Sequence, residues 1–143
     1  MESNITFSRG QVQTWQIEQF VEQIADQYNI FNSYYSNILV SLVESVYVVG
    51  QKEAVNISFW SEKSGLYFFI TGGFSNVGTD DDFTFLISKL SDHYKVSDEG
   101  LTLMFSINSI NKELSAHRKD AYFNYLNGME VKTNDEDHQK NEF

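Results

Sequence analysis

The spacing of hydrophobic residues predicts a series of short strands and helices along most of the chain. Alternation predicts strands over residues 4–8, 54–60 and 101–107, with further strands next to their turns over 66–71 and 93–97. A period near 3.6 predicts helices over 11–28, 34–49 and 83–90 and from Ser109 onward. The predicted order is β-α-α-β-β-α-β-β-α. Hairpins with helices between them indicate an α/β (α+β) two-layer sandwich, with helices on one face of a mixed, largely antiparallel sheet. We expect one domain over residues 1–129 and an acidic, disordered tail over 130–143.

The helix predicted over residues 34–49 is apolar almost all round and carries one narrow polar stripe. Ser33 is its expected N-cap. A helix buried on every side must satisfy its polar groups or point them at a cavity or a ligand. The stripe therefore marks a candidate site, and its carboxylate is the group there that could do chemistry. The stripe consists of Asn37, Ser41, Glu44 and Ser45.

Aromatic side chains are abundant, with 12 Phe and 8 Tyr, so the core should be rich in rings. We expect Tyr34, Tyr35, Phe68 and Phe69 in that core. Trp60 falls at the polar phase of its strand and should face solvent or a partner. A second tryptophan, at position 15, lies beside the apolar face of the first predicted helix, where it would be either an interface anchor or the edge of the core.

Charge and composition narrow the function classes. A net charge of −10, from 20 acidic and 10 basic residues, makes the chain a poor partner for nucleic acid or an anionic membrane. The absence of cysteine excludes disulfides, thiolate catalysis and Cys-ligated zinc. The first residues do not form a secretory signal, and no run approaches the roughly 20 apolar residues of a membrane span. We expect a cytoplasmic protein.

Metal chemistry has little support in the sequence. His93, His117 and His138 are scattered, and none has a ligand-type partner at helical spacing. The run Asp80-Asp81-Asp82 has two interpretations that the sequence leaves open. It either caps a helix and complements its dipole, or binds a metal or a basic partner. We expect no bound metal.

The element order, the helix with Glu44, and the late segment FTFLISKLSDHYKVSDEGLTLMFSI with Asp92 and Gly100 resemble a known superfamily. It is the histidine-kinase-like ATPase superfamily of gyrase, heat-shock chaperones, histidine kinases and MutL. The anti-sigma-factor serine kinases are the most similar branch. The resemblance spans roughly residues 4–107 and implies the fold of that superfamily.

The positions that would serve a nucleotide differ from the family pattern. The resemblance places Glu44 at the general base, but Val48 stands where the family has a magnesium-binding Asn, and a valine offers no oxygen ligand. Gly73 aligns with the Asp that accepts the adenine amino group. Asp81 and Phe83 replace the phosphate-loop glycines, and carboxylates at that helix start would repel a triphosphate. The resemblance thus implies a degenerate member with a vestigial Glu44 and no cofactor.

These departures favour a non-catalytic regulatory or protein-binding module that has lost nucleotide binding. By analogy with the anti-sigma branch, the partner would be a regulator of transcription or signalling. Homodimerisation through the first helix or the sheet edge is also expected, because many members of the superfamily dimerise. Two alternatives stay open. One is an ATP-binding serine kinase with a divergent phosphate loop, and the other is a small-molecule sensor that uses the vacated pocket under Val48 and Gly73.

Overall fold

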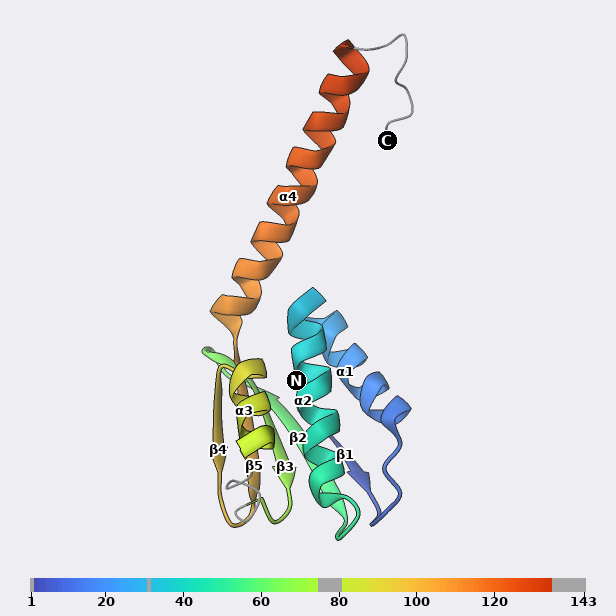
Figure 1. Cartoon of the computed structure of the whole chain (residues 1–143), viewed down its shortest axis with the longest axis vertical. Coiled ribbons are helices and arrows are strands. Elements are labelled where there is room, and N and C mark those ends of the chain that lie inside the picture. The colour runs from blue at the N-terminus through green and yellow to red at the C-terminus, as the bar shows by residue number, and fades with distance from the viewer. Residues whose placement is uncertain (1, 31, 75–80, 135–143) are drawn as a thin grey trace. The chain divides into compact units, whose positions relative to one another are not determined.

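The computed structural model of the chain describes residues 2–30, 32–74 and 81–134 (Figure 1). It divides into two compact units, Met1–Ile110 and Asn111–Phe143. The predicted order of elements is confirmed. The strands are β1 (Glu2–Phe7), β2 (Val55–Ser61), β3 (Gly65–Thr71), β4 (His93–Val96) and β5 (Gly100–Ser106), and the helices are α1 (Thr14–Tyr28), α2 (Asn32–Val49), α3 (Asp81–Leu90) and α4 (Ile107–Asn134).

The first unit is an α+β structure built on one five-stranded sheet with the order β1-β2-β3-β5-β4. Every neighbouring pair of strands is antiparallel, so the expected mixed sheet is wholly antiparallel among the described residues. The chain leaves β3, passes through α3 and returns as β4, and β5 then fills the place between them. The middle strand, β3, is hydrogen-bonded on both sides.

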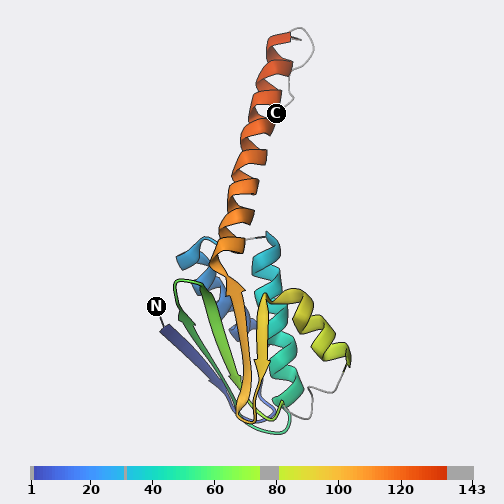
Figure 2. The ribbon, with the colours of Figure 1, turned by 90° about the vertical axis from the view of Figure 1, so that its left-hand side faces the viewer.

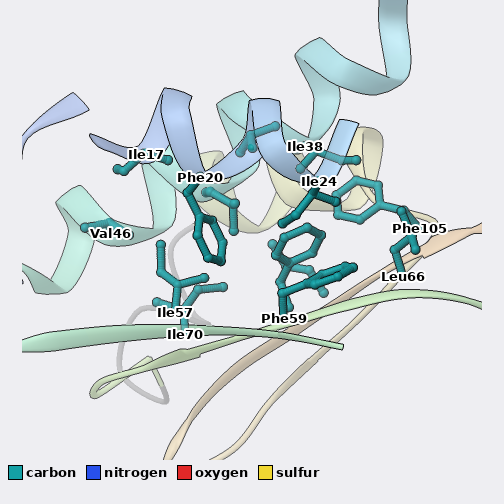
Figure 3. Close-up of a cluster of buried hydrophobic side chains, with 14 of the residues drawn as sticks. Ile17, Phe20, Ile24, Ile38, Val46, Ile57, Phe59, Leu66, Ile70 and Phe105 are labelled. Carbon is teal, nitrogen blue, oxygen red and sulfur yellow. The ribbon is translucent and has the colours of Figure 1, made fainter. Parts of the chain in front are cut away.

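Helices α1, α2 and α3 lie on one face of this sheet (Figures 1 and 2). Strand residues of alternating parity point at them, as in the burial pattern of β2, whose first, third and fifth residues are buried. Figure 3 shows the resulting core between the helices and the sheet. Its largest fully buried side chains include Phe59, Phe68, Phe74, Phe105, Ile17, Ile24, Ile38 and Leu42.

Several element ends differ from the predicted ones because backbone groups set them. α1 begins at Thr14 rather than residue 11, because Gly10 has a positive φ of 70° and the Gln11 N–H donates to the Ser8 carbonyl in a turn. It ends at Tyr28, as predicted, and Asn29 follows in the left-handed region. α2 begins at Asn32, so Ser33 lies inside the helix and its prediction as the N-cap is wrong.

Helix α4 begins at Ile107, two residues before its predicted start. The Ser106 hydroxyl accepts a hydrogen bond from the Ser109 N–H at 3.3 Å, which is the geometry of an N-cap. The helix continues to Asn134, so it includes the first residues of the predicted tail, and residues 135–143 lie outside the described part. In this helix Tyr122, Phe123 and Tyr125 are exposed. Within the described ranges, no helix combines the length and apolarity that a bilayer crossing requires.

Candidate functional site

Helix α2 is buried along one side only, which corrects the expectation of a helix apolar and buried all round. Val40 is 39% exposed and Tyr47 is 42% exposed on its outer side. The polar stripe is divided by this arrangement. Ser41 and Ser45 are fully buried, while Glu44 is exposed to solvent. Glu44 therefore lies at the surface of α2 and is not enclosed with the buried part of the stripe.

The neighbours of two adjacent tyrosines show which flank of α2 carries the serines. The pKa of Tyr35 is raised by burial and by the carboxylates of Glu22, Glu18 and Asp26, which belong to α1. The Tyr34 hydroxyl instead donates to the carboxylate of Asp92, just beyond α3, at 3.3 Å. Ser41 lies seven residues after Tyr34, about two helical turns, and so shares its flank. The buried serines therefore lie on the side of α2 toward α3.

Neither buried hydroxyl of this pair has a hydrogen-bond partner in the described part of the chain. An unmade hydrogen bond on a buried hydroxyl costs about 1–3 kcal/mol. Small side chains at these positions also let a neighbouring helix approach closely, which offsets part of that cost. The serines thus fit a packing role for the inner half of the stripe.

The end of β3, where the sequence places Gly73, packs tightly against the end of α2. Gly72 has a φ of 143°, and a Cβ there would come within 2.9–3.0 Å of the Val49 side chain. The next residue, Gly73, is exposed, and its N–H donates to Glu53 Oε2 at 3.1 Å. The position aligned with the adenine acceptor thus presents a backbone amide that binds a carboxylate of this same chain.

The start of α3 is lined by an aromatic pair. Phe74 is fully buried, and its ring stacks on that of Phe83 with centroids 6.1 Å apart and planes 18° apart. Phe83 and Val48 both pack against the hydrophobic core. Asp81 is the first residue of α3, but its side chain lies outside the described part, as does Asp80. Residues 64–88 contain no lysine or arginine to attract a phosphate.

No metal site forms among the described side chains. Groups of three or more His, Asp or Glu residues with suitable geometry are absent from them. His93 is an exposed residue of β4, while the side chains of His117 and His138 lie outside the described part. Trp15 lies on α1 and is 55% exposed. The structure therefore favours a surface position for this side chain over a place at the edge of the core.

The face of the sheet turned away from the helices, here called the open face, carries two rows of side chains that run across all five strands. The strand register places one residue of each strand in each row. From β1 to β4, the first row is Glu2, Trp60, Tyr67, Met104 and His93, and the second row is Asn4, Ser58, Phe69, Thr102 and Lys95.

The middle of the open face is aromatic and only half-buried. The rings of Trp60 and Tyr67 stack, with centroids 5.4 Å apart, and the indole N–H of Trp60 donates to Glu62 Oε2 at 2.9 Å. Beside this ridge, a hollow of about 280 Å³ is lined by Tyr67, Met104 and residues of β4. Half-buried rings beside a hollow are typical of a surface that contacts another molecule.

Phe69 belongs to this open face, so its predicted place in the core is wrong, whereas Phe68 is fully buried as expected. The two rows were not identified from the sequence. The alternation of β3 carried part of the signal, because Phe68 and Phe69 are consecutive and must point to opposite faces. Trp60 does lie on the polar phase of its strand, as predicted. Which residues of the five strands share a row depends on the order of the strands in the sheet. No local sequence pattern contains that order.

Comparison of the sequence with models of known protein families and with curated proteins finds no match.

Proposed function

We propose that this chain is a non-catalytic regulatory module that works by binding protein, on a scaffold similar to the histidine-kinase-like ATPases. The proposal joins two features: an interior that is closed to a magnesium nucleotide, and an outer sheet face that offers aromatic contacts. The scaffold similarity rests on the element order and on the resemblance of residues 4–107.

One observation carries the first half of this proposal. Apolar side chains pack where the ATPase family would hold the metal and the phosphates. Val48 stands at the metal ligand's position, and the stacked pair of Phe74 and Phe83 lines the start of α3. Neither a valine nor a phenyl ring can coordinate magnesium or donate a hydrogen bond to phosphate. Anion binding at a helix start depends on open backbone N–H groups and a favourable field, and Asp82 in the first turn opposes it.

Glu44 supports the same conclusion from the catalytic side. It is exposed on α2, and the buried part of the polar stripe consists of two serines that point toward α3. A serine kinase needs its base beside a bound phosphate donor. We therefore place Glu44 outside any catalytic role.

A thermal-shift titration with magnesium-ATP tests this half of the proposal. A ligand at one hundred times its dissociation constant stabilises a protein by about 2.7 kcal/mol, which for a domain of this size raises Tm by several degrees. We expect no saturable shift with magnesium-ATP or magnesium-ADP beyond that of magnesium chloride alone. A saturable rise in Tm that Val48→Phe abolishes would overturn the proposal in favour of the ATP-dependent kinase.

The protein-binding half rests on the open face. In the first unit, the helices cover one face of the sheet (Figure 2). On the other face, the aromatic side chains of Trp60, Tyr67 and Phe69 are half-buried. A surface of this kind loses water favourably when a partner covers it.

A further inference from the structure

The charges of the open face lie at its two edges. At the β1 edge stands Glu2, whereas Glu62, which accepts a hydrogen bond from Trp60, belongs to the turn between β2 and β3. At the β4 edge stand His93 and Lys95, in the first and second rows. Uncharged residues occupy the rows between them. The face is therefore acidic on one side, basic on the other, and apolar or neutral in the middle.

This layout is complementary to itself. Consider a two-fold axis that lies in the plane of contact and runs along β3. The rotation reverses the order of the strands but keeps each residue at its level along them. Because each row crosses all five strands at one level, each row then stacks on the same row of the second copy.

The residues that meet under this rotation are chemically matched. Glu2 lies opposite the second copy's His93, and Asn4 lies opposite its Lys95. Trp60 lies opposite the second copy's Met104, and sulfur–aromatic contacts are favourable. At the axis, Phe69 meets its own symmetry mate. Each contact away from the axis occurs twice in the dimer, as an isologous interface requires.

The relief of the face fits the same arrangement. The stacked rings of Trp60 and Tyr67 lie between two hollows, one of about 280 Å³ over β5 and β4 and one of about 380 Å³ over β1 and β2. The rotation places β2 of one copy over β5 of the other, so Trp60 falls on the β4–β5 hollow, while Tyr67 meets its own symmetry mate at the axis. Two-fold stacking of sheets with nearly aligned strands is a common packing.

We propose that the open face is covered by a second copy of this chain, related by a two-fold axis along β3, with Trp60 of each copy seated in the β4–β5 hollow of the other. This contact deepens the proposed protein-binding role, but it differs from an interface through the first helix or the sheet edge. It uses none of the residues of α2 and α3 on which the loss of nucleotide binding is argued.

The size of the face sets the expected affinity. With strands about 4.8 Å apart and a rise of about 3.4 Å per residue, the face measures roughly 20 Å by 20 Å. Two copies would bury about 400 Å² each, or about 800 Å² in total, which is below the roughly 1,200 Å² of the smallest stable interfaces and in the range of weak, transient contacts. We therefore expect a reversible dimer that dissociates on dilution.

Sedimentation velocity of the full chain over a wide concentration range tests the dimer. We expect a monomer–dimer equilibrium that Phe69→Lys weakens at least tenfold, because the substitution places two ammonium groups together at the axis. The matched control is Phe85→Lys, on an α3 residue that is 63% exposed and outside the face, and it should leave the equilibrium unchanged.

A charge exchange at the edges tests the orientation of the axis and does not depend on how well Phe69→Lys folds. Glu2→Lys alone and His93→Glu alone should each weaken the dimer, because each places like charges or an unmatched charge across the interface. The double variant should restore it. These positions are exposed, so the fold should tolerate all three variants.

Several outcomes would overturn the inference. They are a monomer at every concentration, a dimer that Phe69→Lys and the single charge variants leave intact, or a double variant as weak as the sum of its singles. A dimer lost instead in the triple variant Tyr122→Ser, Phe123→Ser and Tyr125→Ser would assign the contact to α4. The magnesium-ATP titration is independent, so failure of one proposal is distinguishable from failure of the other.

Discussion

The two faces of the sheet are built from the same strands but differ in how deeply their side chains are buried. On the covered face, Phe68 is fully buried and its ring lies 5.1 Å from that of Phe59 and 5.9 Å from that of Phe105. On the open face, its neighbour Phe69 is half-buried and lies between Ser58 and Thr102. Helices cover the first ring, whereas the second lies over Gly100 of the neighbouring strand, on the face that α1, α2 and α3 leave uncovered. Stability should therefore reside in one face and association in the other.

The largest expected effect is the difference in lost stability between truncating Phe68 and truncating Phe69. Phe68→Ala should lower the free energy of unfolding by about 3–5 kcal/mol, because it leaves a cavity among packed aromatics. Phe69→Ala should cost about 1 kcal/mol. Urea denaturation at low protein concentration, where a dimer would dissociate, measures both. Equal losses would show that the open face is covered within the single chain, contrary to the comparison.

A second test concerns how closely α2 is held to the end of β3. Gly72→Ala should lower the free energy of unfolding by about 1–3 kcal/mol, since φ is 143° and the new Cβ would meet Val49. Gly73→Ala is the matched control and should change it by about 0.5 kcal/mol or less, because its Cβ would lie 3.7 Å from Glu53 Oε2, an ordinary contact. The comparison fails if both variants unfold at the same urea concentration.

The packing between the helices includes two buried hydroxyls of α2, those of Ser41 and Ser45, that have no hydrogen-bond partner among the described residues. Ser45→Ala should raise the free energy of unfolding by up to about 1 kcal/mol, because a methyl group replaces a hydroxyl that has no partner. Ser36→Ala, at an exposed position of the same helix, measures the gain from helix propensity alone. A loss of stability in Ser45→Ala relative to Ser36→Ala would mean that the hydroxyl binds a group that the packing alone does not reveal.

The smallest expected effect concerns Tyr35 of α2, whose phenol is influenced by carboxylates of α1. Burial and the nearby carboxylates raise the pKa of Tyr35, so folding favours its neutral phenol. Its contribution to stability is complete below the unfolded pKa of about 10 and is lost as the pH rises through the higher folded value. Tyr35→Phe should therefore lessen the alkaline loss of stability in pH-dependent urea melts. Tyr125→Phe in α4 serves as the control, and an identical curve for both variants would contradict the assignment to Tyr35.

Much of the fold could be predicted from the sequence because hydrophobic periodicity reports local structure directly. The alternation over residues 54–60 and the period near 3.6 in α1 each required only neighbouring residues. Element ends were less predictable. The start of α1 depends on a turn at Gly10, and the start of α2 at Asn32 excludes Ser33 as its cap. Such ends depend on single hydrogen bonds that the periodic pattern does not contain.

The candidate site was predicted only in part. The stripe on α2 exists, but its division into buried Ser41 and Ser45 and exposed Glu44 depends on where α1 and α3 pack. The rows of the open face escaped prediction for a related reason. A row needs the pairing of β3 with β5 across α3 and β4, which is a contact distant in sequence. The apolar character of Phe69 suggested burial, although its parity relative to Phe68 indicated the opposite face.

The place of β3 at the centre of the sheet has a mechanical consequence. It is bonded to a strand on each side, so its amides should be among the last to exchange with solvent. A single peptide bond joins Phe68, whose ring is buried in the core, to Phe69, whose ring lies on the open face. A partner that contacts the outer ring would therefore touch the residue next to one that is fully buried in the core.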